Sequence, residues 1–269
     1  ILGCGGSSRN NNTWLQSPGY PNSFNSGQDC QQTIDIEENI CQLRLDIDDL
    51  TLDVPDTTGT CSTDYLTVNQ DTKFDRLCGV TKNNHFYLDV DYSSNSKVIF
   101  SFHTDSSTSY DRTWSIRISK ICCDSLEEVP RGCGQYYTGT TGIIKSLNYE
   151  APSSGDNIIS KLNYGICIRM ELGYCKNTYT EDKTDGWLPI CGDIFERPGR
   201  YDAQVVPTVA AKCHTAGAIN PIPATWTHSY TSPHTFKLDT TRDTTNTHPS
   251  TIAANQDGVY YYSYSQTAC

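Results

Sequence analysis

Apolar and polar residues alternate in the segments of this chain that carry the strongest structural signal. In residues 43–48, leucine or isoleucine occupies every other position, with arginine or aspartate between. Residues 114–119 repeat this pattern, and residues 98–102 and 87–90 are further apolar runs of strand length. Such alternation places one face of a strand on a core and the other in water, as in antiparallel sheets. We therefore expect a strand at each of these segments.

The second half of the chain carries the same period more weakly. Residues 166–171 alternate, and residues 236–239 and 259–264 are expected to be late strands. Turn-forming residues separate the segments, and no stretch keeps a helical period over about twelve residues. Many short strands with frequent turns predict an all-β fold of antiparallel β-sandwiches. Residues 221–251, rich in Thr, Ser and Pro, are expected to be a long loop or an O-glycosylated one.

Thirteen cysteines divide this all-β chain into two halves. They fall into two sets of six, with Cys122 left over, and the order of long and short gaps is roughly repeated. A repeated cysteine framework indicates two copies of one module, hence two disulfide-bonded sandwiches in tandem. We predict domains at residues 1–123 and 133–269, joined by an acidic linker at residues 124–132 as in an extended rod. So many cysteines indicate an oxidising compartment, and therefore a secreted, extracellular protein.

Charge and motifs exclude several classes of function. The net charge of −11 argues against nucleic acid as a partner, because binding a phosphate backbone needs a basic face. No apolar run reaches the roughly 18 residues of a membrane span, and the start at Ile1 is interpreted as a mature N-terminus. The six histidines are scattered without a zinc motif, and no nucleophile or phosphate-binding motif is present. We therefore expect no enzymatic activity.

A series of motifs stands in fixed order in the first half. They are Cys4, Ser17-Pro18-Gly19-Tyr20-Pro21, Cys30, Cys61-Ser62-Thr63-Asp64-Tyr65-Leu66, Leu77-Cys78-Gly79, Phe102-His103-Thr104-Asp105 and Trp114-Ser115-Ile116. With this series the first 123 residues resemble a CUB domain, an extracellular jelly-roll-like β-sandwich. Residues 133–269 are similar to a second, divergent CUB domain, as in the paired-domain proteins of arthropods. There Cys191-Gly192-Asp193-Ile194 stands near the position of the central cysteine motif.

The resemblance implies a disulfide framework that the sequence alone leaves open. Carried over by position, the pairs are Cys4–Cys30, Cys41–Cys123, Cys61–Cys78, Cys133–Cys167, Cys175–Cys269 and Cys191–Cys213. Cys122 is then left unpaired or in an intermolecular bond.

The resemblance also implies a calcium site. In the calcium-binding type of CUB domain, residues at the positions of Asp53, Asp64 and Asp105 converge at one end of the sandwich, and here Asp53 stands in place of a glutamate. Calcium takes oxygen ligands at about 2.3–2.6 Å and would relieve the repulsion between three carboxylates. The alternative is that these are turn aspartates bonded to their own loops. Separately, Asn11 begins an Asn-x-Thr sequon and is a candidate glycosylation site.

These expectations favour a non-catalytic secreted protein. Its predicted partners are other extracellular proteins, the matrix or copies of itself, and head-to-tail contacts could build a structural filament. The alternatives are a soluble carbohydrate- or ligand-binding CUB protein, with a glycan as ligand, and an accessory or inhibitor of a protease cascade.

Overall fold

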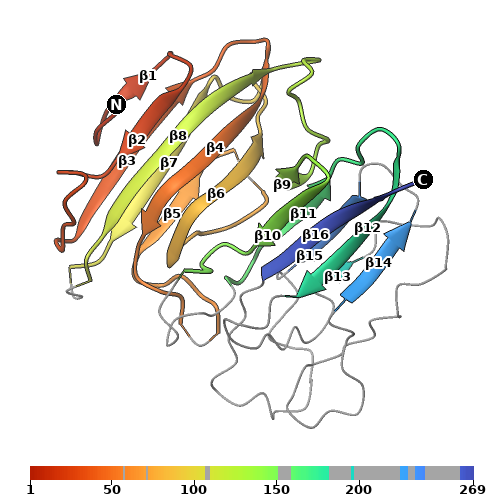
Figure 1. The fold of residues 1–269 in the computed structure, drawn as a ribbon. Helices are drawn as coiled ribbons and strands as arrows, with labels where there is room; N and C mark the ends of the chain where they lie inside the picture. The colour runs from red at the N-terminus through yellow and green to blue at the C-terminus, as the bar shows by residue number, and fades with distance from the viewer. Residues whose placement is uncertain are drawn as a thin grey trace, which may run out of the picture.

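The chain folds, in a computed structural model, as two β-sandwich modules that lie side by side (Figure 1). The structure describes residues 1–56, 58–70, 72–106, 110–150, 159–181, 195–196, 225–229, 234–239 and 261–269. These residues form strands, turns and loops, and no helix. The prediction of an all-β fold is therefore confirmed.

The first module consists of two four-stranded sheets. Its strands are β1 (Ser7–Ser8), β2 (Thr13–Gln16), β3 (Gln28–Asp35), β4 (Ile40–Thr51), β5 (Tyr65–Val68), β6 (Val80–Asp89), β7 (Lys97–Thr104) and β8 (Thr113–Cys122). The sheet orders are β1-β3-β7-β5 and β2-β8-β4-β6. Neighbouring strands are antiparallel, except that β1 runs parallel to β3.

The second module repeats this topology. Its strands are β9 (Cys133–Tyr137), β10 (Thr141–Lys145), β11 (Asn163–Ile168), β12 (Tyr174–Glu181), β13 (Phe195–Glu196), β14 (Thr225–Ser229), β15 (His234–Asp239) and β16 (Tyr261–Ala268). The sheet orders are β9-β11-β15-β13 and β10-β16-β12-β14, which match the first module strand for strand. The parallel pair is also repeated, between β9 and β11. The duplication inferred from the cysteines is therefore a duplication of the fold.

Disulfides occupy matching places in the two modules. One kind ties the N-terminal segment of a module to its third strand, and another ties the fourth strand to the residue after the eighth. The bonds are Cys4–Cys30, Cys41–Cys123 and Cys61–Cys78 in the first module, and Cys133–Cys167 and Cys175–Cys269 in the second. These five are among the pairs that the family resemblance implies, and the sixth, Cys191–Cys213, lies outside the described residues.

The predicted alternation is realised in β4. Leu43, Leu45 and Ile47 are buried, whereas Arg44 and Asp46 between them lie on the partly exposed face. A bulge in the pairing with β8 follows Ile47 and shifts the register by one residue. The apolar face of the strand therefore points into the sandwich along most of its length.

Trp114 lies at the centre of this core with its side chain fully buried. Its ring stacks on Phe102 with a centroid distance of 4.2 Å and meets the edge of Phe24 at 5.5 Å. The indole N–H donates to the side-chain oxygen of Gln32 at 3.2 Å. A buried tryptophan needs such an acceptor, so a polar glutamine is accommodated in the core.

Strand β11 departs from the predicted alternation. Its isoleucines are buried as expected, but Cys167 between them is buried as well. The disulfide of Cys167 with Cys133 packs against Tyr87 and Val129, which precede the second module in the chain. Because these residues cover the second face of β11, the strand has no face left for water.

Candidate functional site

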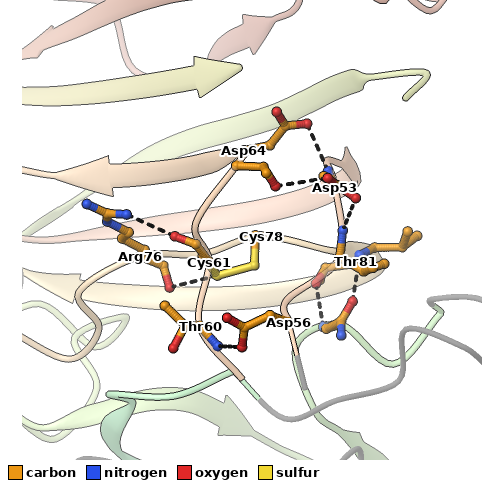
Figure 2. The surroundings of a disulfide bond; sticks show 12 residues. Asp53, Asp56, Thr60, Cys61, Asp64, Arg76, Cys78 and Thr81 are labelled. Atoms are coloured by element: carbon orange, nitrogen blue, oxygen red, sulfur yellow. Dashed lines mark hydrogen bonds between the residues drawn. A yellow bond between two sulfur atoms is a disulfide. The ribbon is translucent and has the colours of Figure 1, made fainter. Parts of the chain in front are cut away.

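Asp53 and Asp64 lie at one end of the first sandwich, beside the Cys61–Cys78 disulfide (Figure 2), and Asp105 contacts Asp64. Asp53 follows β4, Asp64 precedes β5 and Asp105 follows β7. The backbone N–H groups of Asp53 and Asp105 both donate to the Asp64 carboxylate, at 3.0 and 2.9 Å. The fold thus brings the three residues together, but two of them contact the third through their main chain.

The Asp64 carboxylate is also paired with Arg112. The Nε atom of Arg112 donates to Oδ2 at 2.7 Å and Nη2 donates to Oδ1 at 3.0 Å, and both side chains have no exposed surface. The same guanidinium donates to the main-chain carbonyl oxygens of Asp105 and Tyr110, at 2.8 and 3.2 Å. Arg112 therefore joins the turn before β5 to the connection between β7 and β8.

The Asp53 carboxylate bonds within its own neighbourhood. Its oxygens accept the N–H of Val54 and the hydroxyl of Thr63, each at 2.9 Å. This is the behaviour of a turn aspartate, the alternative to a metal ligand.

The residues at this end do not fit a calcium ion. Calcium needs carboxylate or carbonyl oxygens that face a common point. The two oxygens of Asp64 instead accept four N–H bonds, which is about the capacity of a carboxylate. Within the described parts of the chain, no group of three or more His, Cys, Asp or Glu side chains could hold a metal ion.

The loop between Asp53 and Cys61 is held by Asp56. The Oδ1 atom of Asp56 accepts the N–H groups of Thr58 and Thr60, at 2.8 and 3.0 Å. Within this turn, the carbonyl oxygen of Gly59 accepts the N–H of Ser160 at 2.8 Å. The loop end of the first module therefore contacts the second module directly.

A longer contact between the modules runs along β6, the last strand of its sheet. The outward main-chain groups of Val80 are taken by Asn148, whose Oδ1 accepts the N–H at 2.8 Å, and by the N–H of Glu150, which donates to the carbonyl at 3.3 Å. Lys82 repeats the pattern: its N–H donates to the Glu150 carboxylate at 3.2 Å and its carbonyl accepts Lys145 Nζ at 2.6 Å. The second module thus satisfies polar groups that an edge strand would leave open.

Two glycines permit this close approach. A Cβ atom on Gly79 would lie 1.8 Å from Oδ1 of Asn148. A Cβ atom on Gly134 would lie 2.6 Å from the ring of Tyr164 and 2.8 Å from the ring of Phe86. With glycine there, Phe86 of β6 meets Tyr164 of β11 edge to face, with ring centroids 4.9 Å apart. Both glycines lie where a side chain would separate the modules.

His85 lies within the same contact. Its Nε2 atom accepts the N–H of Tyr136 in β9 at 3.0 Å, so the ring is held with Nε2 unprotonated. The rings of Tyr137 and Tyr87 meet it edge-on, with centroids 4.9 and 5.8 Å away. Burial and the nearby charge of Arg44 lower the pKa of His85 to about 4.

The segment between the modules is docked on the first module. Val129 is buried, and its N–H and carbonyl bond to the side-chain amide of Gln42 at 2.9 and 2.8 Å. The N–H of Gly132 donates to Asp89 at 3.1 Å. Residues 124–132 therefore do not act as a free tether, and the modules pack side by side rather than as the extended rod expected from the sequence.

Cys122 and Asn11 are both exposed on the first module. Cys122 ends β8 and has a free thiol, and Leu126, in the segment that follows, is a fully exposed apolar side chain. Asn11 lies in the turn between β1 and β2, and its Oδ1 accepts the N–H of Lys120 at 2.8 Å.

Comparison with protein families identifies both modules. Residues 4–117 match the CUB domain, and residues 130–258 match the animal CUB domain. The chain therefore belongs to the CUB family, with two CUB domains in tandem. CUB domains are generally non-catalytic modules that mediate protein–protein interactions, and with their disulfides they are typical of extracellular proteins. No curated protein matches the chain.

Solved structures also match the chain, at low sequence identity. The CUB1-EGF-CUB2 domains of rat MASP-1 are 15% identical, with a TM-score of 0.36 over 96% of this chain and 99% of that one. The corresponding domain of human MASP-1/3 is 15% identical, with a TM-score of 0.32 over 96% and 100%. The extracellular region of zebrafish Gpr126/Adgrg6 is 16% identical, with a TM-score of 0.36 over 70% of this chain and 21% of that one. Among the residues described here, no helix is long and apolar enough to cross a membrane.

Proposed function

We propose that this chain is a secreted, non-catalytic protein that associates with other extracellular proteins, and with copies of itself, through the surfaces of two CUB domains. The domains are proposed to comprise residues 1–123 and 133–269, with residues 124–132 between them. The observation that carries the proposal is the docking of the two modules along β6, which fixes two recognition surfaces relative to each other. A fixed arrangement lowers the entropic cost of binding a partner at both modules.

Self-association is the more specific form of the proposal. A contact between unlike surfaces of identical units extends into a filament unless its rotation closes it into a ring. The exposed thiol of Cys122 supports a covalent link between neighbouring chains in an oxidising compartment. The proposed secreted protein also carries a glycan on Asn11 and a disulfide between Cys191 and Cys213.

Size measurement of the full chain tests this proposal. Light scattering after size exclusion and negative-stain imaging should show assemblies larger than one chain, and non-reducing gels should show disulfide-linked species. Cys122→Ser, a nearly isosteric change at an exposed position, should remove the linked species and leave the fold intact. A strictly monomeric wild-type protein at high concentration under oxidising conditions would refute self-association. Assemblies that survive unchanged in Cys122→Ser would show that they form without this thiol.

A further inference from the structure

We infer that Arg112 is the built-in cation of the first module, and that its loop end is organised without calcium. The family resemblance places a metal among Asp53, Asp64 and Asp105, but the described residues supply a guanidinium there. Arg112 and Asp64 are both fully buried and form a forked pair of hydrogen bonds, at 2.7 and 3.0 Å.

The ligands of Arg112 are of the kinds that calcium binds. One is a carboxylate and two are main-chain carbonyl oxygens, those of Asp105 and Tyr110. They come from two separate loops, so a single positive group holds both together. A calcium ion would have to displace the guanidinium from Asp64 and leave its charge buried without that partner, which is strongly unfavourable.

The remaining contacts of Asp64 reinforce this arrangement. The N–H groups of Asp53 and Asp105 occupy the other acceptor positions of the carboxylate. Both residues thereby orient their main chains toward Asp64. An ion at the centre of these residues would need the Asp64 oxygens that these donors already hold.

A guanidinium differs from a metal ion in one functional respect. It stays charged at every physiological pH and does not dissociate from the chain. Occupancy of a calcium site, by contrast, follows the concentration of the ion. The loop end of the first module should therefore form on folding and keep its shape whether or not calcium is present.

Calcium titration of the full chain is the direct test. Thermal unfolding in calcium chloride and in chelator should give the same Tm for the wild-type protein. A calcium-dependent rise in Tm that is abolished by Asp64→Asn would overturn the inference. The same holds for a rise abolished by Asp53→Asn, which leaves the ion pair in place. A rise that survives in both variants comes from elsewhere in the chain and supports a metal-free loop end.

A double-mutant cycle tests the pair itself. Arg112→Gln and Asp64→Asn should each lower the Tm by on the order of 10 °C, because each leaves one buried charge without its partner. The double variant should be more stable than the sum of the two losses predicts. Arg9→Gln is the matched control, since Arg9 is 85% exposed and should leave the Tm unchanged. Strict additivity of the two substitutions would contradict the inference. Partner binding plays no part in these measurements, so their outcome is independent of the proposed self-association.

Discussion

The imidazole Nε2 of His85 accepts the main-chain N–H of Tyr136, and this bond joins β6 of the first module to β9 of the second. Only the unprotonated nitrogen accepts this bond. The ring also lies near Arg44 and Asp46 of β4, and against the rings of Tyr87 and Tyr137. The contact between the modules therefore contains a group that titrates in mild acid.

We predict that acid weakens this contact. Burial, and then the charge of Arg44, lower the pKa of His85 from 6.5 to about 4. The unfolded chain takes up the proton near pH 6.5, whereas the folded chain resists it. The contribution of neutral His85 to the free energy of unfolding is therefore complete above pH 6.5. It is lost as the pH falls toward 4, by at most about 3 kcal/mol. Urea unfolding at a series of pH values measures this loss of unfolding free energy.

The control for this prediction is His85→Gln. A glutamine can offer an oxygen to the Tyr136 N–H and does not titrate in this range. The free energy of unfolding of the wild type, minus that of His85→Gln, should fall between pH 6.5 and 4. Parallel pH profiles for the two proteins would show that His85 does not sense acid.

Gly79 should be intolerant of a side chain. Gly79→Ala places a Cβ atom 1.8 Å from Asn148, at a backbone φ of +77° that alanine disfavours. Gly5→Ala is the matched control, because Gly5 has a φ of +75° but no atom within 4 Å of the added Cβ. The control should lose about 1 kcal/mol from strain alone, and Gly79→Ala should lose about 2 kcal/mol more through the clash. Equal losses in the two variants, measured by urea unfolding, would argue against a tight contact here.

Gln42 should protect the segment between the modules from proteolysis. Gln42→Leu leaves the buried N–H and carbonyl of Val129 without partners, which costs about 2–4 kcal/mol. Arg131 is already exposed, so local opening should free the main chain around it, and trypsin should cut there faster, as mass spectrometry of the fragments would reveal. Gln31→Leu, on an exposed position of β3, should leave the cleavage rate unchanged. Cleavage at Arg131 that is equally fast in the wild type would show that the segment is not docked.

Equivalent disulfides of the two modules should differ in their resistance to reductant. Cys4 is exposed, whereas Cys133 and Cys167 are buried beneath Tyr87 and Val129. Exchange requires access of a thiolate to a sulfur atom, so the bond of Cys4 should open first. Mild reduction followed by alkylation and peptide mapping measures the order. Simultaneous opening of both bonds would indicate that the second module is not covered in solution.

The sequence predicts much of the first module well because strands such as β4 keep one face toward water. In β4 and β8 the period of two is visible along the chain, and the cysteines repeat in the second half. The prediction is weaker where one module covers another. Cys167 looks like an outward position, and no local pattern shows that Tyr87 lies on it.

The candidate site could be located from the sequence, but its chemistry could not. Motif positions bring Asp53, Asp64 and Asp105 to one end of the sandwich, and the fold does so too. The role of Arg112 depends on how the connection after β7 folds back onto the turn before β5. The signal that the sequence offers is the position of Arg112. It stands two residues before Trp114, in step with the apolar residues of the alternating strand. The docking of Val129 could not be predicted either, because a single valine in an acidic stretch shows no alternation of apolar and polar residues.

The burial of β6 also bears on aggregation. An edge strand with open N–H and carbonyl groups is a template on which a foreign strand can add. Here the groups of Val80 and Lys82 are capped by side chains and main chain of the second module, so the second sandwich shields the β6 edge of the first. If the first module were produced alone, the β6 edge would be exposed. Its solubility would then depend on another chain or ligand that covers this edge.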